Sequence, residues 1–305
     1  MSRAVITREV PLTVSGLKRP LQGRWALPAS PHAHPANPER PAAVVVVVHG
    51  LGEHQGRHQE LAHRLVEDLG AAVLTYDQRG HGLSPGPRGV AKRWEETLDD
   101  LETAVREARG EAHGAPLFVL GHSQGGLIAL SWALDRGEKA DDLRGLVVSN
   151  PALAIKVPVP RWQHWAAGWL KAWPRVTLGT PLKPAQLTRD PERQAAYRAD
   201  RLNHNRINAI LFLGMIERGP ALVARASQLR VPLLMILGGA DPIIDPATNL
   251  AFFEAAGSPD KTLVHDPDSL HEPLNDLNRT VMFTQIAAWM RNRIPIQHEP
   301  DAIPG

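Results

Sequence analysis

The sequence predicts an α/β fold with a mostly parallel central sheet, and three patterns support this prediction. Short apolar runs recur without polar alternation, as in strands that are buried on both faces of a sheet. Helix-like stretches separate these runs, which is typical of the βαβα alternation of a doubly wound fold. The alternation stops between Pro151 and about Leu229 and then resumes, which indicates an insertion.

The expected strands are rich in β-branched and aliphatic residues. They lie at Ala43–Val48, Ala72–Tyr76, Leu117–Leu120, Leu146–Ser149, Pro232–Leu237 and Lys261–His265. The expected helices lie at about His58–Leu69, Trp94–Arg109, Gln124–Asp135, Pro246–Ala256 and Leu277–Arg293. Two earlier runs, Ile6–Val14 and Leu21–Leu27, predict an antiparallel hairpin at the edge of the sheet.

The insertion follows Leu146–Ser149, the sixth strand run along the chain when the two hairpin runs are counted, and contains no strand-like run. Prolines divide it into at least three helix-like stretches. We therefore expect a helical cap and not a second domain with its own sheet. The expected organisation is a core built from residues 1–150 and 230–305, with a cap at residues 151–229.

Composition and charge exclude several classes of protein. Of the 305 residues, 43% are hydrophobic and 22% are charged, which suits one sizeable core in a polar surface. The 34 basic and 32 acidic residues nearly balance, so no nucleic-acid partner is expected. The absence of cysteine excludes disulfides, thiolate metal sites and a cysteine nucleophile.

The N-terminal segment lacks the features of a targeting sequence. Charges at Arg3, Arg8 and Glu9 interrupt the apolar stretch that a signal peptide needs. No apolar run reaches the ~18 residues of a membrane span. We expect a soluble, cytoplasmic protein.

A candidate nucleophile lies directly after the third parallel strand run. The segment Gly121-His122-Ser123-Gln124-Gly125 matches the G-x-S-x-G pattern, which places a serine on a tight turn between a strand and a helix. A second match, Gly82-Leu83-Ser84-Pro85-Gly86, follows no strand run, and Pro85 has no N–H to offer an oxyanion. Ser123 is therefore the predicted nucleophile.

A serine hydroxyl needs a base, and the base needs an orienting acid. His271 follows the last expected strand and Asp241 follows the one before it. The order serine, acid, histidine places all three at the carboxyl edge of the sheet, where open α/β sheets build their sites. His265 is the nearest alternative base. The alternative acids are Asp245, Asp266 and Asp268, of which the last two lie too close to His271 in sequence to reach its ring without a sharp reversal.

The segment His49–His54 follows the most apolar strand run, and its glycines allow close approach of the backbone to a substrate. We expect the N–H groups of Leu51 and Gln124 to form an oxyanion hole. A phosphate-binding loop is the alternative, but neither G-x-x-x-x-G-K-[ST] nor G-x-G-x-x-G is present here.

Three segments carry a family resemblance. His49–Arg57 (HGLGEHQGR), Tyr76–Ser84 (YDQRGHGLS) and Gly121–Gly126 (GHSQGG) resemble the monoacylglycerol lipase and lysophospholipase branch of the α/β-hydrolase superfamily. The similarity extends from about Leu21 to Met290. It implies an α/β-hydrolase fold with a cap, the triad Ser123, Asp241 and His271, and the oxyanion donors Leu51 and Gln124.

The resemblance also implies that Glu53 and Arg57 line the polar end of the pocket, where a glycerol headgroup would bind. Two residues depart from the family pattern. Gln124 stands where the family usually has methionine, which leaves the backbone donor but changes the pocket wall. Arg201 stands where relatives often have proline.

The function expected from these residues and this resemblance is hydrolysis of a monoacylglycerol or similar single-chain lipid ester, through an acyl-enzyme and without metal or cofactor. The alternatives are a general carboxylesterase, a lysophospholipase and, from a different class, a non-catalytic ligand receptor. A peptidase is disfavoured because nothing acidic in the cap is an evident anchor for a free N-terminus. The sequence leaves the oligomeric state open.

Within the expected cap, Trp162, Trp165, Trp169 and Trp173 are spaced by 3, 4 and 4 residues. Helical periodicity places them on one face. This face either packs on the core or contacts an acyl chain or a lipid interface, since tryptophan suits a boundary between apolar and wet surroundings. Trp165 and Trp169 are candidate substrate-binding residues, and transient membrane association through the cap is the corresponding expectation.

Overall fold

The structure is a computed structural model that describes residues 3–29, 40–140, 142–156 and 168–295. Within these residues, eight strands form one sheet in the order β1-β2-β4-β3-β5-β6-β9-β10. The strands are β1 (Val5–Leu12), β2 (Leu21–Pro28), β3 (Val44–Val48), β4 (Ala72–Tyr76), β5 (Leu117–His122), β6 (Leu143–Ser149), β9 (Leu233–Gly238) and β10 (Lys261–Asp266).

The sheet is parallel from β4 to β10. Strands β1 and β2 form an antiparallel hairpin, and β2 pairs antiparallel with β4. The predicted parallel sheet and edge hairpin are therefore confirmed. The strand termini lie within a few residues of the predicted positions.

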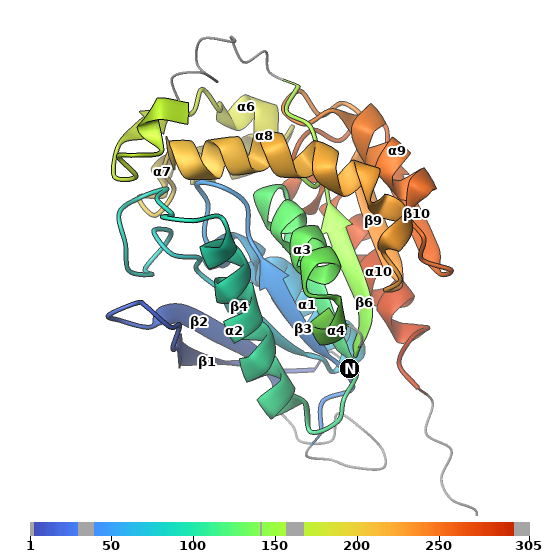
Figure 1. The fold of residues 1–305 in the computed structure, drawn as a ribbon. Helices are drawn as coiled ribbons and strands as arrows, with labels where there is room; N and C mark the ends of the chain where they lie inside the picture. The colour runs from blue at the N-terminus through green and yellow to red at the C-terminus, as the bar shows by residue number, and fades with distance from the viewer. Residues whose placement is uncertain (1–2, 30–39, 141, 157–167, 296–305) are drawn as a thin grey trace, which may run out of the picture.

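Helices cover both faces of the sheet (Figure 1). One face carries α1 (Gln59–Leu69) and α10 (Arg279–Arg291), and the other carries α2 (Glu95–Ala112), α3 (Gln124–Asp135) and α9 (Pro246–Ala255). The short elements are α4 (Gly137–Ala140) and the 3-10 helices η1 (Gln55–His58), η2 (Ala226–Gln228) and η3 (Pro273–Asn275).

The central strand β3 shows why the strand runs lack polar alternation. Its five valines are all buried. Val44, Val46 and Val48 pack into the core under α2 and α3, whereas Val45 and Val47 pack into the core under α1 and α10. Because side chains alternate between the faces of a strand, two buried faces require an unbroken apolar run.

The inserted segment lies over the carboxyl end of the sheet, where α8 crosses above α3 (Figure 1). It contains α6 (Pro184–Leu187), α7 (Pro191–Ala199) and α8 (Ala209–Ala224). It also contains β7 (Thr177–Gly179) and β8 (Arg206–Asn208), which pair antiparallel. The prediction that this segment has no strand is wrong, because strands of three residues are too short to show a period in sequence. The boundary at residues 151–229 stays a prediction.

The buried side chain of Asn208 fastens this cap to the core. Its oxygen accepts the N–H of Leu211 and so caps α8. Its amide nitrogen donates to the carbonyl oxygens of Ala91 at 2.6 Å and Pro174 at 2.8 Å. One side chain thus begins α8 and joins it to the loop before α2.

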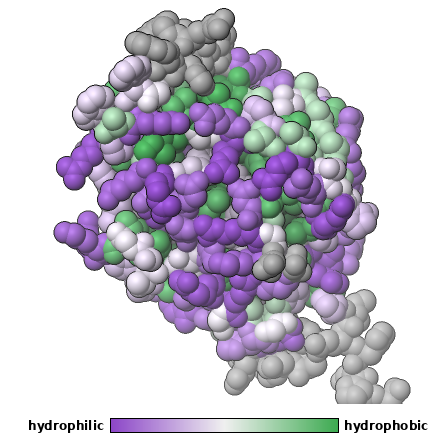
Figure 2. Space-filling view, viewed as in Figure 1, coloured by the Kyte–Doolittle hydropathy of each residue, from purple (hydrophilic) through white to green (hydrophobic). Residues whose placement is uncertain are grey.

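The surface in the view of Figure 2 is mostly hydrophilic, with apolar patches near the cap. Among the described residues, no helix is both long and apolar enough to cross a membrane.

Candidate active site

Ser123 lies on a sharp turn between β5 and α3, with a backbone φ of 51° and ψ of −118°. Such angles are strained for a residue with a side chain and persist only where the surroundings hold them. The flanking glycines are required by close contacts. A Cβ on Gly121 would lie 2.4 Å from the carbonyl oxygen of Gly125, and a Cβ on Gly125 would lie 2.2 Å from that of Val48.

His271 and Asp241 reach Ser123 from the loops after β10 and β9. The Oγ of Ser123 lies 2.8 Å from Nε2 of His271, and Nδ1 of His271 lies 2.7 Å from Oδ2 of Asp241. Because a carboxylate only accepts hydrogen bonds, Nδ1 carries the proton and Nε2 accepts from the serine hydroxyl. All three residues are buried. The structure thus brings together the three residues that the sequence indicated.

The surroundings of Asp241 keep its carboxylate charged. Its Oδ1 accepts the N–H groups of Ile243 at 2.7 Å and Ile244 at 3.0 Å. Burial raises the pKa of Asp241, but His271 and these two N–H groups outweigh burial, so the net pKa is lowered.

The pKa of His271 shifts in the opposite direction. Burial lowers it, but the charge and hydrogen bond of Asp241 outweigh burial, and the net pKa lies above the usual 6.5. An imidazole oriented and made more basic in this way is suited to accept the serine proton.

Two of the alternative acids have other roles in the structure, and the third, Asp268, is exposed. Asp245 caps α9 by accepting the N–H groups of Ala247 and Thr248. Asp266 accepts from the N–H of Asp268 and from the side chain of Asn278. The alternative base, His265, lies on β10 with an exposed side chain.

The loop after β3 lies beside Ser123, and Gly50 and Leu51 line the same cavity as the serine. Gln124 is the first residue of α3, where a helix leaves N–H groups without intrahelical acceptors. Its side chain turns toward Met215 of α8, with Nε2 3.8 Å from Sδ. The use of the Leu51 and Gln124 N–H groups as oxyanion donors stays a prediction.

The side chain of Glu53 stabilises the conformation of the loop after β3. Its Oε1 accepts the N–H of Gly50 and lies 3.3 Å from Nε2 of His58, and its Oε2 accepts from Arg57 at 3.0 Å. Burial raises the pKa of Glu53, but His58 and Arg57 outweigh burial and hold the pKa well below its usual range. Although Glu53 lines the cavity, its carboxylate is occupied by bonds that shape the loop, a role that the sequence did not reveal.

The cavity above Ser123 has a volume of about 520 Å³, within the usual range for small-molecule sites. Its walls come from the core loops and from the cap. The apolar wall residues include Leu51, Ile155, Leu178, Leu182, Leu187, Ile207, Phe212, Met215, Ile243 and Ile244.

The polar end of the cavity is built on Arg57. Its guanidinium donates two parallel bonds of 2.6 Å to Glu272 and stacks 4.8 Å from the ring of Tyr197 on α7. Burial raises the pKa of Tyr197 to about 12, with Arg57 acting in the opposite sense. Glu272 was not among the predicted residues, and its position directly after His271 is the sequence signal that could have identified it.

The tryptophan stripe is only partly described, because Trp162 and Trp165 lie outside the described residues. Trp169 and Trp173 are 65% and 60% exposed, so these two side chains are not buried in the core. Trp169 is also not among the described residues that line the cavity. The structure therefore places it on the cap surface and not in the pocket.

Fold and site together define a serine hydrolase with the α/β-hydrolase fold. Residues 39–278 match the family model described as serine aminopeptidase, S33. Because the match covers most of the chain, this protein belongs to that family.

Individual relatives agree with this assignment. The chain is 32% identical over 259 residues to the monoglyceride lipase of Homo sapiens, covering 83% of this chain and 84% of the human protein. It is also 32% identical to an uncharacterized abhydrolase domain-containing protein of Dictyostelium discoideum. That match covers 84% of this chain but only 27% of the longer Dictyostelium protein. The crystal structure of Paleococcus ferrophilus monoacylglycerol lipase superimposes with a TM-score of 0.76 and 31% identity, covering 83% of this chain and 96% of that one.

Proposed function

We propose that this protein hydrolyses monoacylglycerols and similar single-chain esters through an acyl-enzyme on Ser123. The observation that carries the proposal is the hydrogen-bonded chain of Ser123, His271 and Asp241 at an apolar cavity with one polar end. The similarity to the human monoglyceride lipase and the Paleococcus ferrophilus monoacylglycerol lipase supports this substrate class.

In the proposed reaction, Nε2 of His271 takes the hydroxyl proton of Ser123 while Oγ attacks the ester carbonyl. The N–H groups of Leu51 and Gln124 donate to the oxyanion that forms. The tetrahedral intermediate expels the alcohol, which receives the proton from His271. Water then attacks the acyl-enzyme, with His271 again as base, and releases the fatty acid and Ser123.

The charges at the polar end favour a neutral alcohol over a phosphate headgroup. Arg57 is shared between two carboxylates, Glu53 and Glu272. One positive and two negative charges disfavour an anionic group, whereas hydroxyls can both accept from Arg57 and donate to Glu272. This observation ranks a monoacylglycerol above a lysophospholipid.

An aminopeptidase is the alternative to compare directly. The described part of the cavity contains the carboxylates Glu53 and Glu272, whose two negative charges exceed the single positive charge of Arg57, so peptide amides belong among the substrates tested.

Turnover separates the proposal from a non-catalytic receptor. Purified protein should cleave monoacylglycerols faster than lysophospholipids and peptide amides of matched hydrophobicity. A fluorophosphonate should label the wild type at Ser123, with no label on Ser123→Ala. Binding of the lipid without turnover or labelling would support the receptor instead.

The headgroup assignment is tested with Glu272→Gln. This variant removes one negative charge while it keeps the size of the side chain. We expect kcat/KM for a monoacylglycerol to fall more than kcat/KM for a p-nitrophenyl ester of the same acyl chain, and turnover of a lysophospholipid to rise relative to both. Equal losses on all three substrates would indicate a purely structural role.

The cap surface beside the cavity supports a contact with lipid. Trp173, Val176 and Leu178 are all exposed on this segment, and Leu178 also lines the cavity. Exposed apolar side chains at the mouth of a lipid-ester site suit an interface from which a single chain enters.

Two exposed valines provide a matched test of this contact. Val176 lies on the cap, 44% exposed, and Val281 lies on α10, 52% exposed. Val176→Ser should reduce binding to vesicles and turnover of vesicle-embedded monoacylglycerol, with turnover of a soluble short-chain ester unchanged. Val281→Ser should change neither. Similar effects of both substitutions would contradict a contact through the cap.

A further inference from the structure

The loop between β10 and α10 carries His271 and contains little regular structure. Apart from η3, its residues belong to neither helix nor strand. The imidazole nevertheless lies within 2.8 Å of both of its partners, and a general base works only within such distances. Side-chain contacts, both within the loop and from other elements, therefore hold it in place.

Asn150 holds the loop from the core. Its amide nitrogen donates to the carbonyl oxygens of Leu270 at 3.1 Å and His271 at 3.0 Å. Its amide oxygen accepts the N–H of Gly238, at the end of the strand that leads to Asp241. One buried side chain thus fixes the loops of both the base and the acid.

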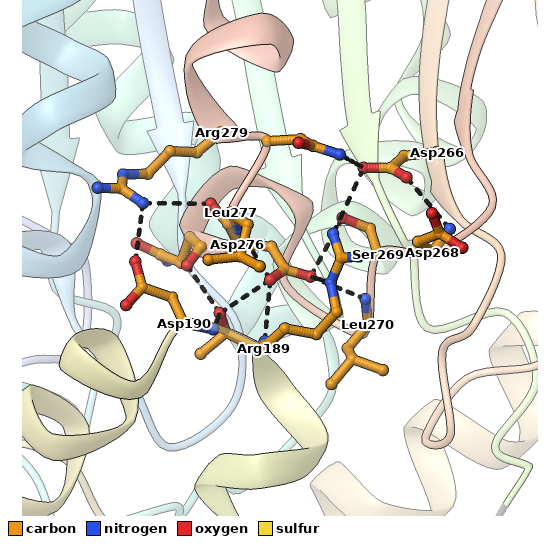
Figure 3. A network of polar contacts seen from close by, with 12 residues as sticks. Arg189, Asp190, Asp266, Asp268, Ser269, Leu270, Asp276, Leu277 and Arg279 are labelled. Atoms are coloured by element: carbon orange, nitrogen blue, oxygen red, sulfur yellow. Dashed lines mark hydrogen bonds and ion pairs between the residues drawn. The ribbon is translucent and has the colours of Figure 1, made fainter.

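Within the loop, the buried carboxylate of Asp276 accepts hydrogen bonds from several neighbouring residues (Figure 3). Its Oδ2 accepts the N–H of Leu270 at 3.1 Å and the hydroxyl of Ser269 at 3.3 Å. Its Oδ1 accepts the N–H of Leu277 at 2.8 Å. Leu270 is the residue directly before His271, so this carboxylate acts on the backbone that places the imidazole.

The same carboxylate also binds the cap. Arg189 donates its Nε to Oδ2 at 3.0 Å and its backbone N–H to Oδ1 at 2.9 Å. The hydroxyl of Thr188 lies 3.2 Å from Oδ1 and 2.9 Å from the carbonyl oxygen of Asn275, in the same loop. Thr188 and Arg189 lie between α6 and α7. A parallel connection runs from the N–H of Glu272 to the carbonyl oxygen of Leu187 at 2.8 Å.

These neighbours require a charged carboxylate at position 276. Burial raises the pKa of Asp276, but the N–H groups of Leu270, Leu277 and Arg189 outweigh burial, so the net pKa is lowered. The three N–H groups and the guanidinium of Arg189 are all donors. A carboxylate can accept from all of them, whereas an amide would present N–H groups to other donors.

We propose that Asp276 is a positioning residue for His271, and that it makes the placement of the imidazole depend on attachment of the cap through Thr188 and Arg189. This inference rests on the proposed role of His271 as general base. Asp276 is not among the described residues that line the cavity, so its loss should act on turnover and not on substrate binding.

The test is the variant Asp276→Asn, assayed on a soluble p-nitrophenyl butyrate. We expect kcat to fall by up to about 10²-fold, the loss that a small displacement of a catalytic group produces, with KM nearly unchanged. Asp100→Asn is the matched control. Asp100 lies on α2, is equally buried, and accepts hydrogen bonds from Arg79 at 2.9 and 2.6 Å. The control should lower the melting temperature while kcat is retained.

The proposal is overturned if Asp276→Asn retains kcat, or if Asp100→Asn loses as much kcat at a comparable melting temperature. Thr188→Val tests the cap connection with almost no change in volume and remains available if Asp276→Asn does not fold. Thr188→Val should lower kcat by a smaller factor than Asp276→Asn. Thr97→Val is its control: Thr97 is also buried but lies on α2, and its substitution should leave kcat unchanged. Equal kcat in these two variants overturns the dependence on the cap.

Failure of the proposed function has a different signature. If Ser123→Ala turns over the ester as fast as the wild type, the triad itself is wrong. If Ser123→Ala is inactive and Asp276→Asn is fully active, only the positioning role of Asp276 is wrong.

Discussion

The two G-x-S-x-G segments place their serines in opposite chemical situations. Ser123 donates toward an imidazole, from a strained turn that opens a helix. Ser84 is equally buried, but its Oγ donates to the carbonyl oxygen of Asp77 at 2.6 Å and accepts the N–H of Gln22 at 2.9 Å. The hydroxyl of Ser84 is thus occupied by the backbone, and that of Ser123 is presented to a base.

The residue after each serine extends this comparison. Gln124 carries a backbone N–H at the start of α3, whereas Pro85 has none and instead accepts, through its carbonyl, the N–H of Gly80 at 2.9 Å. The same five-residue pattern therefore builds a reactive turn in one place and a closed loop in the other. A motif of this kind indicates a nucleophile only where a base and a free N–H accompany it.

The largest effect is expected from removal of the nucleophile or the base. Ser123→Ala and His271→Ala should each reduce kcat on the order of 10⁶-fold, and the double variant should lose little more, because the two residues act as a unit. Steady-state turnover of a p-nitrophenyl ester measures this. An active Ser123→Ala together with an inactive Ser84→Ala would reverse the assignment of the two turns.

Asp241→Asn should have the next largest effect, a loss of roughly 10⁴ in kcat, since an amide orients the wrong imidazole tautomer. The pH dependence of activity should also shift in a defined direction. Neutral His271 is the active form and its pKa is raised, so wild-type activity falls as the pH drops through that value. Without the Asp241 charge, burial lowers the pKa, and the acid limb of kcat/KM should move to lower pH. An acid limb that stays in place would contradict this role for Asp241.

Gln124→Pro places a proline after Ser123, as Pro85 follows Ser84. Proline is accepted at the first position of a helix and removes the proposed oxyanion donor, although it also restricts the backbone of the preceding residue, here Ser123. We expect kcat to fall by ~10²–10³, with Gln124→Ala as the control that keeps the N–H and most of the activity. Comparable losses in both variants, at matched melting temperatures, would assign the effect to the Gln124 side chain.

The smallest effect on catalysis is expected for Ser84→Ala. Its loss leaves the N–H of Gln22 and the carbonyl of Asp77 without this partner, which should lower the free energy of unfolding by ~1–3 kcal/mol. Thermal or denaturant unfolding measures this change, and turnover should stay near that of the wild type. A large loss of kcat without a loss of stability would show that the Ser84 turn takes part in catalysis.

The sequence by itself predicted the parallel sheet, the helices on both faces and the three residues that meet at the candidate site. These features follow from local patterns. An unbroken apolar run marks a strand with two buried faces, and a glycine-flanked serine after such a run marks the turn. Chain order then assigned His271 and Asp241, because parallel strands end at the same edge of the sheet.

Only the tertiary structure decided the contacts between distant segments. Arg57 and Glu272 are 215 residues apart, and Asp276 meets Thr188 and Arg189 across 88 and 87 residues. The pairing of β7 with β8 and the exposure of Trp169 belong to the same group. Such contacts have no period and no fixed spacing, because they depend on which surfaces the packed cap and core bring together.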